Sequence, residues 1–102
     1  MEVSAWKNGA FGAQGLRFGI RVGPVNRAKH FNRDWPTVSV ELQNGPTVEI
    51  PIAEGFWCHC PELRHDAISE WLQVRGLVPW PDRHPPKLAL NPLGGRRFRL
   101  SK

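Results

Sequence analysis

One segment of this sequence, residues 61–75, has the features of a complete helix with both ends defined, and it constrains what the rest of the chain can form. Pro61 fits the first helical position, because its missing N–H would have no partner there. Gly76 follows the last turn, where a left-handed residue often ends a helix, and Leu77 is then placed for an apolar contact back to Leu72. The sequence therefore predicts one main α-helix, 61–75.

The same helix is predicted to be amphipathic, because its apolar and polar residues separate at the roughly 100° per residue of an α-helix. The apolar stripe consists of Leu63, Ala67, Trp71 and Val74, widened by Ile68 and Leu72. The polar side consists of Glu62, Asp66, Ser69, Glu70 and Gln73. The pattern predicts that the helix packs on one face of a sheet, with Trp71 buried between them.

The rest of the chain indicates short strands and tight turns, since it has ten glycines, ten prolines and no second convincing helix. Alternating apolar residues, typical of half-buried strands, mark residues 16–22, 37–42, 47–52, 87–90 and 97–100. A chain of this length is expected to form a single domain, 1–102, that buries about 65% of its unfolded surface. The expected class is α+β: an antiparallel sheet or partly closed barrel of about five strands, with one main α-helix (61–75) packed on one face.

Two of these strands flank the dipeptide Asn44-Gly45, which often forms a two-residue hairpin turn. Such a turn would place Val40 opposite Glu49 and mix apolar and charged side chains on one face. A five-residue connection instead keeps the apolar side chains of both strands inward. We prefer that register, which pairs Leu42 with Val48, Val40 with Ile50 and Val38 with Ile52.

The preferred register has a cost, because it sets Glu41 opposite Glu49 and like charges directly opposite are destabilising. Arg17 and Arg21 point outward from the strand at 16–22 in its alternation. They would relieve the repulsion if that strand lay alongside the hairpin. The sequence therefore predicts a meander of at least three strands.

Three other segments are predicted to be irregular. Residues 6–15 carry glycine at every third position but lack the lysine-serine/threonine pair of a phosphate loop, which favours a plain turn-rich segment. Residues 23–36 form a basic loop with one short helical turn. Residues 78–86 are stiffened by proline, with Trp80 either an exposed stacking platform or, in the favoured interpretation, packed against the core.

The densest cluster of side chains capable of chemistry consists of Cys58, His59, Cys60 and His65. Zinc is disfavoured, because structural sites place roughly two to four residues between paired cysteines, whereas one residue separates these two. A reactive thiol is a second possibility, since Cys60 would lie at a helix N-terminus, where a thiol pKa is lowered. The favoured interpretation is that both cysteines are reduced, small and buried. We therefore expect no metal, no cofactor and no enzymatic activity.

The charge distribution is the most informative functional feature. The net charge is +5; residues 17–33 and 83–102 are basic and contain no acid, whereas residues 34–70 contain seven acids and only one base, Arg64. Either the basic ends neutralise the acidic middle, or they converge on one face, which together with nearby aromatic residues is typical of nucleic-acid binding. The candidate nucleic-acid-binding residues are Arg17, Arg21, Arg27, Lys29, Arg33, Arg96, Arg97 and Arg99.

These features predict a small non-enzymatic binding module whose basic surface binds nucleic acid or another polyanion. The alternative is a protein-interaction or self-associating domain, a homo-oligomer that binds no nucleic acid, because five Trp and five Phe exceed what one helix on a small sheet must bury. A cytoplasmic protein without a membrane partner is expected, since no apolar run approaches the about 18 residues of a membrane span and the N-terminus lacks a signal-peptide pattern.

Overall fold

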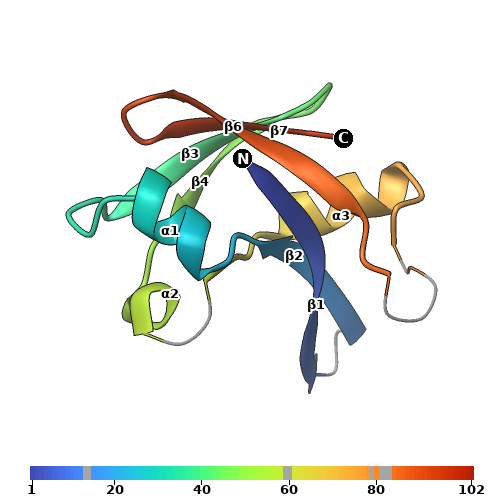
Figure 1. The fold of residues 1–102 in the computed structure, drawn as a ribbon. Coiled ribbons are helices and arrows are strands. Elements are labelled where there is room, and N and C mark those ends of the chain that lie inside the picture. The colour runs from blue at the N-terminus through green and yellow to red at the C-terminus, as the bar shows by residue number, and fades with distance from the viewer. Residues whose placement is uncertain (13–14, 59–60, 79, 81–83) are drawn as a thin grey trace.

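The computed structural model describes residues 1–12, 15–58, 61–78, 80 and 84–102, and between residues 8 and 17 it describes the backbone alone. The strands are β1 (Glu2–Gly12), β2 (Gly15–Arg21), β3 (Thr37–Leu42), β4 (Thr47–Pro51), β5 (Glu62–Leu63), β6 (Lys87–Gly94) and β7 (Arg97–Ser101). The helices are α1 (Pro24–His30), α2 (Glu54–Cys58) and α3 (Asp66–Val74) (Figure 1). No helix within these ranges is long and apolar enough to cross a membrane.

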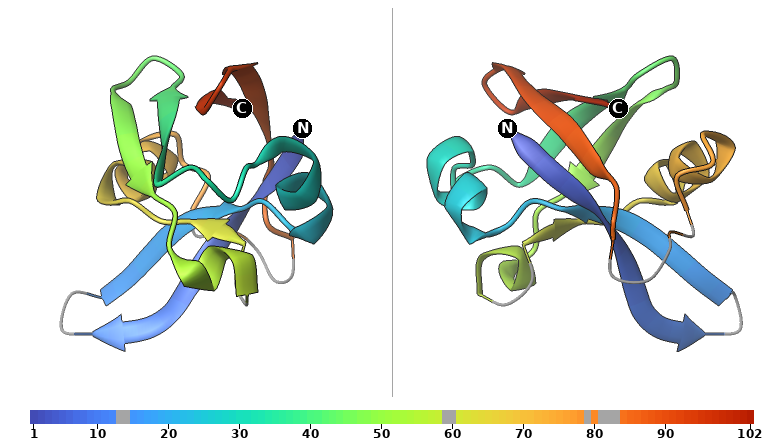
Figure 2. Two further views of the ribbon diagram at one scale, coloured as in Figure 1. Left: turned by 90° about the vertical axis from the view of Figure 1, so that its left-hand side faces the viewer. Right: turned by 45° about the vertical axis from the view of Figure 1, so that its right-hand side comes forward.

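The strands belong to one sheet, in the order β4-β3-β7-β6-β1-β2-β5. Neighbouring strands are antiparallel except β3 and β7, which are parallel. The sheet curls into a nearly closed barrel with β4 and β5 at its edges (Figure 2). The predicted α+β class with a largely antiparallel, barrel-like sheet is confirmed. The prediction of about five strands and one main helix is wrong, because the described residues form seven strands and three helices.

β1 is the longest strand that the sequence pattern does not predict. Most of the glycine-rich segment 6–15, predicted to be turn-rich, continues β1 or begins β2. Val3 and Ala5 of β1 are buried, and they alternate with the less buried Ser4 and Trp6. β1 pairs with β2 between Ser4 and Gly12, and its first residues, Glu2–Ser4, also pair with β6. The segment is therefore extended despite its glycines.

α3 begins at Asp66 rather than at Pro61, so the predicted helix start is wrong. His65 is the N-cap, and its Nδ1 accepts a hydrogen bond from the Ala67 N–H at 3.0 Å. The carbonyl of Pro61 instead accepts the N–H of Val22 at 2.8 Å, just before β5 pairs with β2. Strand pairing with a distant part of the chain thus overrides a local sequence that favours a helix.

The C-terminal end of α3 agrees with the prediction. Gly76 has a φ of 68°, and the Leu77 N–H donates to the Leu72 carbonyl at 3.0 Å, as in a Schellman ending. The buried face, however, is rotated from the predicted stripe and comprises Ile68, Ser69, Trp71 and Leu72. Trp71 is buried as predicted, but Val74 is 76% exposed. The rotation brings Ser69 against β2, where its Oγ accepts a backbone N–H at 3.3 Å.

Apolar side chains from all these strands fill the inside of the sheet. Buried as predicted are Phe18, Ile20, Val22, Val38, Val40, Leu42, Ile50, Leu88, Leu90, Phe98 and Leu100. The Leu16 side chain lies outside the described residues, and Val48 and Ile52 are partly buried against the core. Trp80 also packs on the core, with its ring centroid 5.8 Å from that of Phe18, which confirms the favoured interpretation for this residue.

β3 and β4 pair two residues away from the predicted register. The observed pairs include Val38 with Ile50 and Val40 with Val48. A shift of two residues keeps every side chain on its face, so the inward set is right although the pairs are wrong. The connection is shorter than predicted, because Asn44 adopts a φ of 59° and the Leu42 N–H donates to the Pro46 carbonyl at 2.9 Å.

The predicted repulsion between Glu41 and Glu49 does not arise in this register. Glu49 lies opposite Ser39, and Glu41 lies opposite Thr47. The predicted meander with the strand at 16–22 is also wrong, since the second neighbour of β3 is β7. Arginines of β7 therefore lie beside the acids of this hairpin.

Candidate nucleic-acid interface

The structure places the eight predicted basic residues on three parts of the fold. The β7 group consists of Arg96, Arg97 and Arg99, and the α1 group consists of Arg27, Lys29 and Arg33. Arg17 and Arg21 lie on β2, where strand alternation assigns both positions to one face. The side chain of Arg17 is outside the described residues.

The β7 group is paired with acids of the adjacent hairpin. The parallel register sets Arg99 beside Glu41, with Nη2 3.0 Å from Oε1, and Arg97 Nη2 lies 3.5 Å from the other oxygen of that carboxylate. Arg96 Nη1 lies 3.3 Å from Glu49 Oε2. Such exposed pairs contribute only about 0–1 kcal/mol each to stability. They nevertheless neutralise charge, as expected if the basic C-terminal segment offsets the acidic middle.

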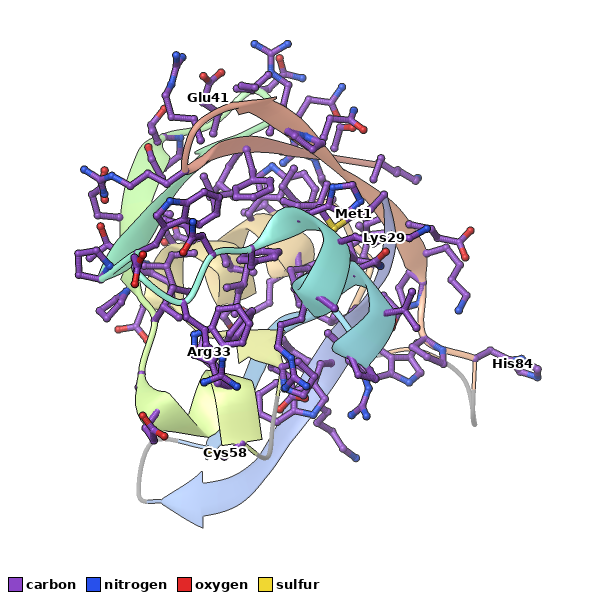
Figure 3. All side chains as sticks on the ribbon, turned by 60° about the vertical axis from the view of Figure 1, so that its left-hand side comes forward. Met1, Lys29, Arg33, Glu41, Cys58 and His84 are labelled. Carbon is purple, nitrogen blue, oxygen red and sulfur yellow. The ribbon has the colours of Figure 1, made fainter. Side chains whose placement is uncertain are left out.

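Two members of the α1 group, Arg27 and Arg33, lie over the half-buried Trp57 of α2. The guanidinium carbon of Arg33 lies 4.8 Å from the Trp57 ring centroid, and that of Arg27 lies 5.8 Å away. Arg27 also donates from Nη1 to the Phe56 carbonyl at 2.8 Å. Among the described residues no ion pair joins this group to a carboxylate. Figure 3 shows Arg33 and Lys29 on the side formed by α1 and α2, away from Glu41.

Aromatic packing fixes α1 and α2 at one end of the barrel. Phe31, which ends α1, stacks on Phe98 of β7 with ring centroids 4.8 Å apart, and its ring lies 5.1 Å from that of Phe56 in α2. Asn26 of α1 donates to a carbonyl of β1 at 2.8 Å and to the carbonyl that follows β2 at 3.0 Å. The predicted basic loop with a short helical turn is thus an ordered element held against the core.

Cys58 is exposed, so the prediction that it is buried is wrong. α2 ends at this residue, and its Sγ donates a hydrogen bond to Glu54 Oε1 at 3.3 Å. This bond raises the pKa of the Cys58 thiol above its ordinary value, although Arg33 and Arg27 act to lower it. The arrangement disfavours the thiolate that a reactive cysteine requires.

The remaining members of the predicted cysteine-histidine cluster give no site that the structure describes. Cys60 and His59 lie outside the described residues, while His65 caps α3. The helix that was to activate Cys60 begins only at Asp66. Within the described part of the chain, no three His, Cys, Asp or Glu side chains are grouped to hold a metal ion.

A third arrangement, which the sequence does not predict, lies on the outer face of β1, β2 and β5. We call it the Trp6 cluster; it consists of Trp6, Arg21, Glu62 and Arg64. The guanidinium carbon of Arg64 lies 4.8 Å from the Trp6 ring centroid. Trp6 is paired with Gly19, where an added Cβ would lie 3.2 Å from Trp6 Cε3 and 2.6 Å from the Leu63 carbonyl oxygen. Only glycine therefore allows both the ring and β5 to approach β2 this closely.

Glu62 holds the arginines of the Trp6 cluster together. Its side chain is only 2% exposed, and its two carboxylate oxygens lie 3.5 Å from Arg21 Nη1 and 3.8 Å from Arg64 Nη2. Two features of the sequence could have indicated this cluster. Trp6 occupies the outward position next to the alternating Val3 and Ala5, and Arg64 is the one base among the seven acids of residues 34–70. What brings them together is the pairing of β2 with both β1 and β5.

No protein-family model, curated protein or solved structure matches this chain. The geometry of the described residues alone therefore defines the candidate interface, which consists of the α1 group and the Trp6 cluster; the β7 group is neutralised by its acids.

Proposed function

We propose that this protein is a small non-enzymatic module that binds nucleic acid through phosphate contacts made by the α1 group. The observation that carries the proposal is the contrast between two sets of basic residues. The β7 group is paired with Glu41 and Glu49, whereas no described ion pair neutralises the α1 group.

The chemistry of the α1 group suits phosphate. Arginine presents a planar fork of donors that matches phosphate oxygens, and lysine adds a mobile point charge. Trp57 holds the guanidinium groups of Arg27 and Arg33 on one ring, so less side-chain freedom is lost when an anion binds. The carboxylate of Glu54 in α2 accepts a hydrogen bond from the Cys58 thiol, and among the described residues no ion pair joins it to Arg27 or Arg33.

Binding of this kind is weak, non-specific and sensitive to salt. Each neutralised phosphate contributes about 0.7 to 0.9 to the slope of log affinity against log salt concentration, so contacts by the whole α1 group give a slope of about −2 to −3. Dissociation constants on the order of 10⁻⁴ to 10⁻⁶ M are typical of non-specific binding at physiological salt.

The test is fluorescence anisotropy with labelled oligonucleotides at two salt concentrations. Arg27→Ala/Arg33→Ala should reduce affinity at low salt by at least tenfold and flatten the salt slope. Arg97→Ala/Arg99→Ala removes the same charge from a paired site and is the matched control, with an expected loss of less than about threefold. Equal losses in the two variants, or no salt-sensitive binding by the unaltered protein, would contradict the proposal.

A protein-interaction or self-associating module is the second candidate. Val74 is 76% exposed, and it lines an open cleft of about 230 Å³ together with Pro46, Ala67 and Trp71. This function predicts nucleic-acid-free protein that sediments at twice the monomer mass, and Val74→Lys should shift it to the monomer. Either function fits the proposed cytoplasmic location.

A further inference from the structure

We infer that the Trp6 cluster is a stacking site for one unpaired base of a single-stranded nucleic acid. The inference rests on the proposed function, because it assumes that nucleic acid is the ligand. A protein with this site prefers single-stranded nucleic acid. The stacking contact is distinct from the phosphate contacts of the α1 group.

The Trp6 side chain lies on the outer face of the sheet, because it alternates along β1 with the buried Val3 and Ala5. Gly19 lies beneath it without a side chain, and an added Cβ there would press on the ring from 3.2 Å. The Arg64 guanidinium lies over the ring, with its carbon 4.8 Å from the ring centroid. A planar cation on this face stands in for a planar base.

Arg64 can leave the ring at little cost. Its side chain is 55% exposed, and its ion pair with Glu62 is long, at 3.8 Å. Loss of an exposed cation–π contact within the protein weakens binding of a competing base only about two- to fivefold. A base stacked on an aromatic side chain strengthens binding by roughly 5- to 150-fold, so the exchange favours the base.

The charges around the ring suit the flanking phosphates. The Arg21 side chain is 53% exposed, and the buried carboxylate of Glu62 holds it in the cluster. The other oxygen of the same carboxylate lies 3.8 Å from Arg64 Nη2, so an Arg64 side chain that leaves the ring still has Glu62 as a partner. Both guanidinium groups therefore stay next to the stacked nucleotide.

This geometry selects single strands over duplexes. In a duplex the faces of the bases are stacked on one another, so the Trp6 ring has no exposed base face to contact. Phosphate contacts by the α1 group are available in either form. The preference for single strands should therefore depend on Trp6, while the shared, salt-dependent affinity should not.

The test uses a mixed-sequence single strand of about 12 nucleotides and the duplex of the same length, which offer the same phosphate chemistry. The unaltered protein should bind the single strand at least fivefold more tightly, and its tryptophan fluorescence should be quenched by the single strand. Trp6→Leu should bring the two affinities within about twofold while duplex binding is unchanged. Trp6→Phe keeps an aromatic ring and serves if the leucine variant does not fold. It is expected to lose the fluorescence quenching, whereas the matched control Trp35→Phe is expected to retain it.

The outcomes separate the two hypotheses. Failure of the unaltered protein to bind either oligonucleotide at low salt overturns the proposed function and this inference with it. The stacking site alone is overturned by either of two results. One is salt-sensitive binding without a preference for the single strand; the other is fluorescence quenching that persists in the Trp6→Phe variant.

Discussion

The indole Nε1 of Trp71 donates a hydrogen bond to the backbone carbonyl of Gln43 at 2.8 Å, which joins α3 to the turn between β3 and β4. Arg75 donates to the same carbonyl, and its guanidinium carbon lies 4.2 Å from the Trp71 ring centroid. The Gln43 N–H in turn donates to the Leu100 carbonyl at 2.9 Å. One turn residue thus connects the main helix, the hairpin and β7.

Trp71→Ala is expected to lower the free energy of unfolding by about 3–5 kcal/mol, because it removes a large buried side chain as well as this hydrogen bond. Val74→Ala in the same helix is the control, with an expected change within about 0.5 kcal/mol for so exposed a residue. Urea denaturation measures both. Similar losses in the two variants would show that α3 packs through a different face.

Gly19→Ala is expected to cost about 1–3 kcal/mol, since the added Cβ would lie 2.6 Å from the Leu63 carbonyl oxygen and force β5 away from β2. Gly55→Ala is the matched control, because nothing lies within 4 Å of its Cβ position. Alanine also favours the helix there by up to about 1 kcal/mol. A thermal melt in which both variants behave alike would be inconsistent with the close contact of β2 and β5.

Glu41→Gln should strengthen nucleic-acid binding at low salt. The substitution releases Arg97 and Arg99 from their shared carboxylate while costing at most about 1 kcal/mol of stability. Glu70→Gln on the exposed side of α3 changes the net charge equally and controls for it. Anisotropy titrations should show the larger gain for Glu41→Gln; equal gains would mean that only the total charge matters.

Alkylation of Cys58 should be slow at neutral pH, because the hydrogen bond to Glu54 raises the pKa of the thiol. The pH at which the alkylation rate is half-maximal should be higher in the folded protein than in the unfolded chain. Loss of the carboxylate in Glu54→Gln should lower the midpoint, whereas Arg33→Ala should raise it further. The pH dependence of iodoacetamide labelling in a Cys60→Ser background gives these values. A midpoint below that of the urea-unfolded chain would refute the assignment.

The sequence predicts the parts of this fold that local patterns encode. Alternation identifies the inward face of β3 and β7, and Gly76 identifies the end of α3. β5 is missed because two residues carry no periodic signal, and they form a strand only by pairing with β2. The register of β3 and β4 is missed by two residues because both registers bury the same side chains.

The candidate site divides in the same way. The basic segments are visible in the sequence, but the partners that distinguish Arg33 from Arg99 are not. Glu41 and Arg99 are 58 residues apart and meet only through the parallel pairing of β3 and β7. Trp6 and Arg64 likewise meet only after β1, β2 and β5 have paired.

The position of β7 between β3 and β6 also means that the sheet can be completed only after β7, the last strand in the described chain, has paired. Without β7 the sheet is two separate pieces, β4-β3 and β6-β1-β2-β5. Contacts between residues so distant in the chain slow folding, because a long loop must close before they form. On a ribosome the barrel therefore remains open until residues 97–101 have left the exit tunnel, and chains stalled before residue 97 should be cleaved by protease far faster than released protein.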